Sequence, residues 1–231
     1  MNSLARNDLV WIDALAWQQI QAHEWDTQAR EILKHWESCD FPLVVGRQRA
    51  DVPDQEVCLG LPAPRQWGLR RLALQAPGDR IKAQGSFPSL AQVARIHVWG
   101  PLVQDLRSGL MYCGVDARVY GSHGWQYLTG LPYLHEESDI DLTIQVPDFE
   151  TARQVAQQLA STQLPQRLDG ELVFAGGLAV AWRELNQLLA EQVAQIMVKD
   201  LHQVRLVDMS TLCHLAEHPL NARSPAFQFL A

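Results

Sequence analysis

Two aspartates separated by one residue, Asp139 and Asp141, have the spacing of paired ligands on a β-strand. Alternate side chains of a strand point to the same face, so both carboxylates project together while Ile140 faces the other side. Carboxylate oxygens suit hard cations such as magnesium, and two such ions can hold the attacking and leaving oxygens of a phosphoryl transfer. The triplet also fits two solvated acids at the start of a strand, so it needs support from elsewhere in the chain.

That support comes from Gly121 and Ser122, which stand where an upstream strand gives way to a short helix. Glycine allows the backbone to approach a phosphate closely, and the first amides of a helix have no partner within it. A turn that merely begins the helix would use the same residues. Glycine-serine on one strand with Asp-x-Asp on the next is a rarer combination than either motif alone, and together they predict phosphate chemistry.

A two-metal site needs a third carboxylate, and the following strand offers Asp169 and Glu171 on one face. We favour Asp169 slightly, because a shorter side chain holds a metal or a proton acceptor more rigidly. Glu171 stays open as the alternative. We expect Glu184, which follows the next strand, to cap its helix rather than to join the site.

Three more residues outside these motifs were considered. Arg118 precedes the glycine-serine loop and is either a substrate-binding residue or a structural ion-pair partner. Lys199 is a candidate for binding the triphosphate of a substrate. For His123 we favour a solvent-facing loop position over an acid-base role.

Two clusters of charged residues are expected to have no part in the chemistry. His135, Glu136 and Glu137 resemble a metal cluster in sequence, but we do not predict a zinc site there. Four arginines make the first part of the chain locally basic and suit either a grip on an acidic partner and phosphates or, more simply, ordinary surface charge. They are Arg47, Arg49, Arg70 and Arg71.

The elements that position these residues are an alternation of strands and helices. Residues 140–146 alternate apolar and polar side chains, and Asp148 is placed to cap the helix that follows. Residues 184–198 have apolar side chains at helical spacing. Further elements are expected at residues 89–108 and 125–128 (helices) and at residues 117–120, 167–174, 178–182 and 204–207 (strands).

The first part of the chain forms a smaller unit. A helix is predicted over residues 13–35, followed by strands at residues 41–45, 57–61 and 69–74. Residues 76–88 are rich in proline and glycine, and we interpret them as a linker. The predicted organisation is therefore α+β throughout, with an N-terminal accessory domain at residues 1–82, which binds a protein partner or the substrate, and a catalytic domain at residues 83–231.

Composition limits the possible partners. The 231 residues carry a formal net charge of -7, which disfavours binding to a nucleic-acid polymer because that requires many phosphates to be neutralised. No apolar run approaches membrane-spanning length, and the N-terminus lacks the apolar stretch of a signal peptide. The four cysteines are widely scattered. We therefore expect a cytoplasmic protein without a membrane partner.

Several segments together resemble one known family, the malonate decarboxylase holo-(acyl-carrier-protein) synthases, also called phosphoribosyl-dephospho-CoA transferases. The first domain matches more loosely than the second, through residues 41–45 and 59–62. The segments that carry the resemblance are Arg118-Val119-Tyr120-Gly121-Ser122, Trp125-Gln126, Leu128-Thr129-Gly130, Tyr133-Leu134, Ser138-Asp139-Ile140-Asp141-Leu142, Arg167-Leu168-Asp169-Gly170-Glu171 and Ala179-Val180-Ala181-Trp182-Arg183-Glu184-Leu185.

The resemblance implies a nucleotidyltransferase of the DNA-polymerase-β type, with a mixed sheet flanked by helices. Such an enzyme moves phosphoribosyl-dephospho-CoA from 2'-(5''-triphosphoribosyl)-3'-dephospho-CoA to a serine of the acyl-carrier subunit of malonate decarboxylase, releasing pyrophosphate. In this scheme Asp139 and Asp141 hold Mg²⁺ (or Mn²⁺), Asp169 or Glu171 completes the site and accepts the serine proton, and Ser122 with the amides around it binds the departing phosphates.

Other functions remain open at this stage. The same fold serves other acceptors, such as the carrier protein of citrate lyase, a small molecule or tRNA, although the net charge argues against RNA. A third possibility is a non-catalytic subunit that only binds the carrier protein. Like-charged carboxylates held close together argue against that possibility, because a binding module has no need of them.

Overall fold

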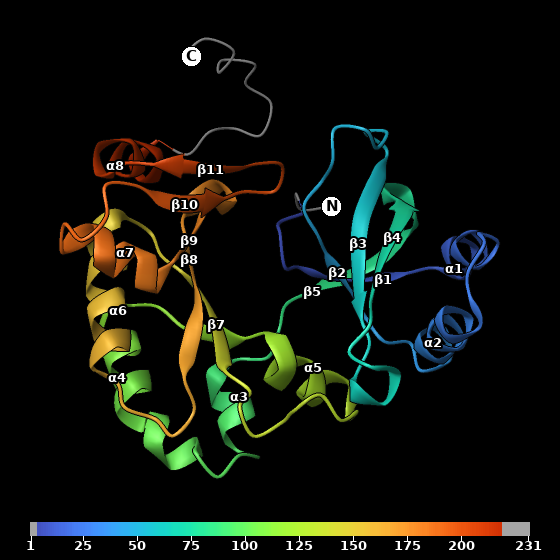
Figure 1. Ribbon diagram of the computed structural model, residues 1–231, viewed down its shortest axis with the longest axis horizontal. Coiled ribbons are helices and arrows are strands. Elements are labelled where there is room, and N and C mark those ends of the chain that lie inside the picture. Colours follow the sequence, from blue (N-terminus) through green and yellow to red (C-terminus); the bar gives the residue numbers. More distant parts are fainter. Residues whose placement is uncertain (1–3, 219–231) are drawn as a thin grey trace.

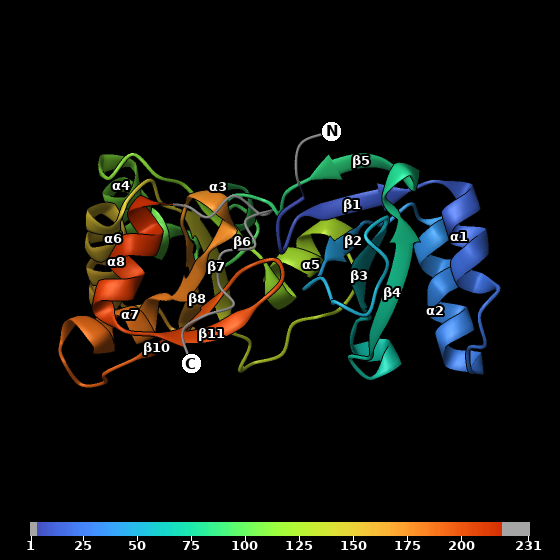
Figure 2. The same cartoon turned by 90° about the horizontal axis from the view of Figure 1, so that it is seen from above.

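The computed structural model describes residues 4–218, which form two α+β domains side by side (Figures 1 and 2). Each domain is built on one sheet with its own apolar core. The α+β class predicted from the sequence is confirmed.

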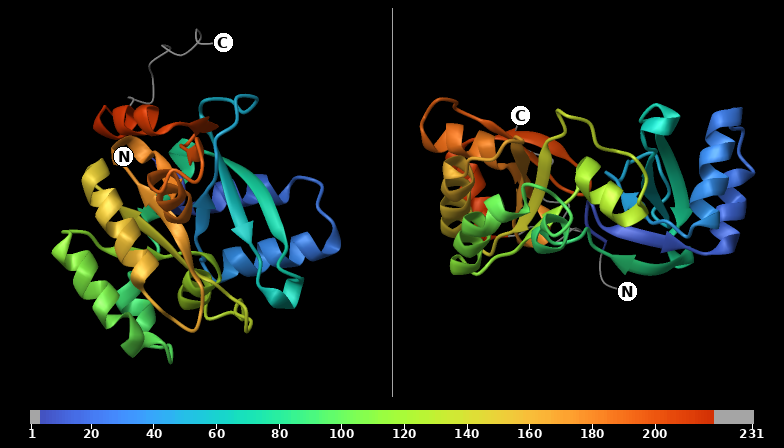
Figure 3. Two further views of the ribbon diagram at one scale, coloured as in Figure 1. Left: turned by 60° about the vertical axis from the view of Figure 1, so that its left-hand side comes forward. Right: turned by 90° about the horizontal axis from the view of Figure 1, so that it is seen from below.

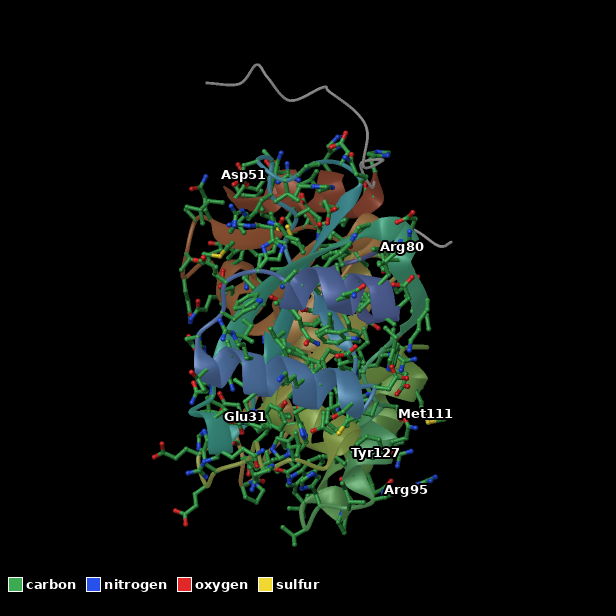
Figure 4. All side chains as sticks on the ribbon, turned by 90° about the vertical axis from the view of Figure 1, so that its right-hand side faces the viewer. Glu31, Asp51, Arg80, Arg95, Met111 and Tyr127 are labelled. Carbon is green, nitrogen blue, oxygen red and sulfur yellow. The ribbon has the colours of Figure 1, made fainter. Side chains whose placement is uncertain are left out.

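The first domain contains a five-stranded antiparallel sheet with the strand order β4-β3-β2-β1-β5. Two helices pack against it, and Figure 4 looks onto them from outside, lying across the strands. Aspartates at the first helical turns fix where these helices begin, because Asp13 accepts from the backbone N–H of Ala16 and Asp26 from that of Ala29. The elements are β1 (Leu9–Ile12), α1 (Ala14–Gln21), α2 (Thr27–Ser38), β2 (Leu43–Val45), β3 (Glu56–Pro62), the short 3-10 helix η1 (Arg65–Trp67), β4 (Arg71–Pro77), η2 (Gly78–Arg80) and β5 (Ile81–Gly85).

Two predictions for this domain were wrong. The single helix over residues 13–35 is in fact two, because Asp26 caps a second helix after the break at residues 22–26. The expected linker at residues 76–88 instead contains η2 and β5, and β5 pairs with β1, so that the expected boundary at residue 82 falls inside a strand. Main-chain pairing with β1, a strand that was also not predicted, holds this proline- and glycine-rich segment in the sheet.

The second domain contains a six-stranded mixed sheet with the order β11-β10-β9-β8-β7-β6. Only β7 and β8 run parallel, and they pair in register from Ile140 opposite Leu168 to Gln145 opposite Val173. The other neighbours are antiparallel. The strands are β6 (Ala117–Val119), β7 (Ile140–Gln145), β8 (Leu168–Val173), β9 (Ala179–Ala181), β10 (Ile196–Lys199) and β11 (Val204–Val207).

Helices cover one face of this sheet and leave the other toward the first domain (Figure 1, and Figure 3 from two further sides). Ile140, Leu142 and Ile144 of β7 are buried on the helix-covered side, as the alternation predicted. Asp148 caps α6 through the backbone N–H of Thr151, also as predicted. The helices are α3 (Leu90–Ala94), η3 (Gly100–Val103), α4 (Gln104–Tyr112), α5 (Gly121–Thr129), α6 (Phe149–Ser161), η4 (Ala175–Gly177), α7 (Trp182–Leu189) and α8 (Met209–Glu217).

Two long helices predicted in this domain are interrupted. The helix expected at residues 184–198 ends at Leu189, where Glu191 takes a positive φ of 53°, and the apolar residues Ile196 and Val198 belong instead to strand β10. The helix expected at residues 89–108 divides into α3, η3 and α4. Gly100 lies so close to the carbonyl of Ala94 that a side chain there would overlap it, which requires glycine at this bend.

The two domains share an apolar contact through α5. Trp125 of this helix belongs to the core of the first domain, where its ring lies 5.4 Å from that of Phe87 and 6.4 Å from that of Trp36. The hydroxyl of Tyr133 donates to the carbonyl of Pro62 at 2.7 Å. The helix that begins at the Gly121-Ser122 motif is therefore anchored in both domains.

Candidate active site

Three aspartates gather at one end of the parallel pair β7–β8. Asp141 lies directly opposite Asp169 in the register, and Asp139 stands just before β7. Burial, followed by the charges of Asp169 and Asp139, raises the pKa of Asp141 to about 6, against an opposing effect of Arg167. We call Asp139, Asp141 and Asp169 the carboxylate cluster.

Arg167 is the cation that the structure places at this cluster. Its Nη2 lies 3.2 Å from Oδ2 of Asp169, and its Nε lies 3.9 Å from Oδ2 of Asp139. The arginine side chain is 58% exposed, so water screens its charge. One solvated cation against three carboxylates leaves the cluster with excess negative charge, which a bound cation would neutralise.

The N-terminus of α5 lies against the same carboxylates. Gly121 has a φ of +59°, and a methyl group on its Cα would overlap Oδ2 of Asp141. The backbone N–H of Tyr120 donates to the carbonyl of Asp141 at 3.0 Å, which holds the loop to β7. Ser122 follows at the first turn and is half-buried. Only glycine fits here, and its place next to Asp141 brings the two sequence motifs together.

Glu171, two residues beyond Asp169 on the same face of β8, has a different environment. Its side chain is only 8% exposed and accepts hydrogen bonds from Lys199 Nζ at 2.9 Å and from Arg6 Nη2. Arg6 comes from the segment before β1 in the first domain and was not predicted from the sequence. We call Arg6, Glu171 and Lys199 the ion-pair cluster.

Tyr120 is a second residue near the site that the sequence analysis did not single out. It lies between the Gly121 loop and β6, and its ring centre is 6.4 Å from that of Phe87. Burial raises the pKa of its hydroxyl, and the negative charges of Glu171, Asp141 and Asp169 raise it further. Tyr120 therefore stays neutral beside the carboxylates and can donate a hydrogen bond there.

Arg118 lies on β6 opposite Thr143 of β7. Its Nη1 donates to the carbonyl of Phe87 at 2.8 Å, and the residue is exposed on the uncovered face of the sheet. Among the described residues, no carboxylate pairs with Arg118. The structure thus gives no ion-pair partner to this arginine within the described residues and places it two residue pairs away from Asp141 along the β6–β7 ladder.

The expected position of His123 was wrong. We expected a loop histidine facing solvent, but α5 begins four residues earlier than predicted and carries His123 into the protein, where it is 3% exposed. Its Nδ1 lies 3.4 Å from Nε2 of His97, and its ring meets that of Trp99 edge to face. Burial lowers its pKa to about 4, so it is neutral near pH 7 and packs behind the site.

The remaining candidates have partners away from the carboxylate cluster, and the cap expected from Glu184 is absent, because α7 has no side-chain cap hydrogen bond. Oε2 of Glu184, in the first turn of α7, accepts from the backbone N–H of Met197, and Nδ1 of His135 accepts from that of Glu137. Arg70 pairs with Asp26, and Arg49 pairs with Asp51. These contacts account for the four side chains without a role in the chemistry.

The carboxylate cluster suits a hard divalent cation by the chemistry of its donors. Within residues 4–218, no three side chains of His, Cys, Asp or Glu are already gathered as a complete ligand set. Carboxylate oxygens are nevertheless the donors that magnesium prefers, and magnesium commonly takes only one or two of them and fills its other positions with water and substrate phosphates. An incomplete set of acids beside a helix N-terminus fits such shared coordination.

Comparison with known proteins identifies the family. The family model described as phosphoribosyl-dephospho-CoA transferase MdcG N-terminal domain matches residues 5–87, and the one for the C-terminal domain matches residues 89–210. The chain belongs to this transferase family. The division falls just after β5, and the second matched region contains the carboxylate cluster and the Gly121-Ser122 motif.

Relatives in this family cover most of the chain. The phosphoribosyl-dephospho-CoA transferase of Bradyrhizobium diazoefficiens is 36% identical over 86% of this chain and 91% of its own. That of Xanthomonas campestris pv. campestris is 35% identical over 90% and 95%, and that of Pseudomonas aeruginosa is 30% identical over 62% and 70%. No solved structure matches the chain. In the described residues, no helix combines the length and the apolar character needed to cross a membrane.

Proposed function

We propose that this protein transfers phosphoribosyl-dephospho-CoA from 2'-(5''-triphosphoribosyl)-3'-dephospho-CoA to a serine of the acyl-carrier subunit of malonate decarboxylase, and that the reaction releases pyrophosphate in the cytoplasm. The family membership supports the group that is transferred. The observation that carries the chemistry is the approach of Gly121, at the first turn of α5, to Asp141, with Asp169 opposite in the register.

The reaction is an in-line displacement at the α-phosphorus of the donor. The serine oxygen forms a bond to this phosphorus while the bond to the β-phosphate oxygen breaks, and the electron pair leaves with pyrophosphate. The serine proton must pass to a base. Asp169 serves this role, because its Oδ2 lies in the cluster and its other oxygen accepts only the adjacent N–H of Gly170 at 2.8 Å.

Asp139 and Asp141 hold the metal in this proposal. Mg²⁺ or Mn²⁺, when bound, supplies the positive charge that a triphosphate needs as it is attacked. The position of Asp141 favours cation binding. Burial and two neighbouring carboxylates make its charged form unfavourable until a cation binds. The free backbone N–H groups of α5, with Ser122 among them, bind the departing phosphates.

The structure favours Asp169 over Glu171 as the third carboxylate. Glu171 is engaged with Arg6 and Lys199, whereas Asp169 lies directly opposite Asp141. Glu171 then has a positioning role: it holds two cations two residue pairs from the carboxylate cluster, where they attract the negatively charged donor. In this proposal Lys199 and Arg118 are substrate-binding residues, and Arg6 joins them.

The proposal is tested by the intact mass of the apo carrier subunit after incubation with this protein, magnesium and the triphosphoribosyl donor. We expect a mass gain equal to phosphoribosyl-dephospho-CoA, and no gain with the variant Asp141→Asn or with a carrier whose acceptor serine is alanine. The apo carrier subunit of citrate lyase and a reaction without carrier are included, because a gain in the former or consumption of the donor in the latter would indicate another acceptor. No donor consumption by the folded protein under any condition would contradict the proposal.

A further inference from the structure

A cavity of about 490 Å³ lies on the uncovered face of the second sheet, between this sheet and the first domain. Its floor includes Arg118 of β6 with Thr143 and Gln145 of β7. Residues 4–8, which lead into β1, and Phe87, which follows β5, close it from the other side. A cavity of this size falls within the range that binds small molecules or cofactors.

The cavity begins next to the carboxylate cluster. Thr143 is two residues beyond Asp141 on the same face of β7, which places it roughly 7 Å away, and Gln145 lies roughly 7 Å further on. Arg118 is opposite Thr143 in the register. A substrate whose phosphate lies at the carboxylate cluster therefore needs only one intervening group, such as a sugar, before its next part enters the cavity.

The wall combines apolar and polar groups from both domains. Leu4 and Leu201, which are partly exposed, give it apolar surface, and Asn7 and Gln145 offer amide groups. The guanidinium of Arg118 uses one N–H on the carbonyl of Phe87, and within residues 4–218 its other N–H groups have no recorded acceptor. Apolar walls with a few amides suit a nucleoside, and an arginine with free donors suits a phosphate.

We propose that this cavity binds the adenosine 5'-diphosphate part of the donor, with its diphosphate against Arg118. The proposal rests on the proposed function, because it takes the donor from there. In that donor the attacked phosphate is attached to a ribose, which is linked to the 2' oxygen of the adenosine. The adenosine is thus the next large group after the sugar, and the pantetheine arm begins only beyond the 5'-diphosphate.

The cavity does not suit the protein acceptor. Residues 4–8 and the glycine pair Gly176–Gly177 enclose its edges, and a space of a few hundred cubic ångströms admits a nucleotide but no folded domain. The carrier must therefore reach the carboxylate cluster from another side. A cavity that holds the donor on one side and leaves the other to the carrier allows both substrates to bind together.

The test is calorimetric titration of the protein with ADP, dephospho-CoA, adenosine and pantetheine, without metal and with a chelator, so that binding through the carboxylate cluster is suppressed. We expect ADP and dephospho-CoA to bind at the same site and pantetheine to bind not at all. Thr143→Phe, which fills the floor of the cavity, should weaken ADP at least about tenfold. Arg118→Gln should weaken ADP but leave adenosine nearly unchanged, because only ADP presents phosphates to the guanidinium.

The matched control is Asp141→Asn. Asp141 lies on the same strand and the same face as Thr143, but it belongs to the carboxylate cluster and not to the cavity. It should bind ADP as the wild-type protein does while losing transfer. Gln145→Trp, at the exposed end of β7, is a second filling variant in case Thr143→Phe fails to fold, which thermal melting would show.

Three outcomes would overturn this inference: no ADP binding to the wild-type protein, equal ADP binding to both filling variants, or ADP binding that disappears in Asp141→Asn. Failure of the proposed function gives a different result, in which ADP binding depends on the cavity but no carrier protein is modified. Steady-state transfer adds a separate readout, because folded filling variants should raise the KM for the donor more than they lower kcat.

Discussion

The carboxylate cluster and the ion-pair cluster are neighbours on one sheet face, yet their charges are balanced in opposite ways. The first has three acids against one solvated arginine. The second has one buried acid against two cations, one of them from the other domain. Asp169 and Glu171, two residues apart on β8, belong to different clusters. Residue type and position on the strand thus do not decide the role of an acidic side chain. The charges that surround it in the folded protein decide it.

This difference has a physical consequence for ligand binding. Carboxylates held together without enough cations cost stability in the free protein, and that cost is recovered when a metal binds. A buried glutamate that holds two cations is already satisfied and provides a fixed positive region beside the acids. In the proposed function, the first cluster would hold the cation of a metal–triphosphate donor, and the cations of the second would attract its phosphates.

The largest expected effect comes from removing one acid of the carboxylate cluster. Asp141→Asn should lower the transfer rate by on the order of 10³-fold or more, because the metal loses a charged ligand at the centre of the site. Without metal, the variant should be at least as stable as the wild-type protein, because the substitution removes the carboxylate charge that Asp139 and Asp169 repel. Transfer is measured by carrier mass and stability by urea unfolding; a folded variant with wild-type transfer would exclude Asp141 from the chemistry.

A smaller loss is expected when the helix next to that acid is displaced. Gly121→Ala places a methyl group on Oδ2 of Asp141 and requires a positive φ that alanine disfavours. A shift of about 1 Å in the site costs roughly 10²-fold in rate. Gly130→Ala, at the other end of α5, has the same positive φ but nothing within 4 Å of the added methyl group, so it is the matched control and should keep its rate.

The comparison between neighbouring acids is tested directly by Asp169→Asn and Glu171→Gln. The first should lose transfer by about 10²-fold with little change in stability, because a proton acceptor is removed from a partly exposed position. The second should lower the free energy of unfolding by about 1 to 3 kcal/mol, because Arg6 and Lys199 lose a buried partner. The reverse pattern, with Asp169→Asn unstable and Glu171→Gln stable but inactive, would exchange the two assignments.

The smallest expected effect is a pH dependence of stability in the metal-free protein. The pKa of Asp141 rises from 3.8 to about 6 on folding, so the folded state binds its proton more tightly and this contribution to stability is lost as the pH rises through this window. His123, with a pKa lowered to about 4, acts with the opposite sign. The measured quantity is therefore the difference in melting temperature between Asp141→Asn and the wild-type protein, which should grow from pH 4 to pH 6.5. A difference independent of pH would contradict the shift.

The sequence was a good guide where local spacing decides the outcome. The alternation along residues 140–146 correctly predicted strand β7 and the face to which its aspartate points. Asp148 correctly predicted where α6 begins. It failed where pairing is distant. β1 and β5 hold each other across the first domain, and Ile196, which continues the helical spacing of the residues before it, is held instead in strand β10 between β9 and β11.

The sequence by itself determined which acids share a strand face and that a glycine begins the neighbouring helix, because these follow from backbone geometry over a few residues. Only the tertiary structure decided which of Asp169 and Glu171 is buried against two cations. Arg6 reaches Glu171 across 165 positions of sequence, and no local pattern records such a contact. Electrostatic interactions depend on distance in space rather than along the chain, so the role of a charged side chain is fixed only when the domains are packed together.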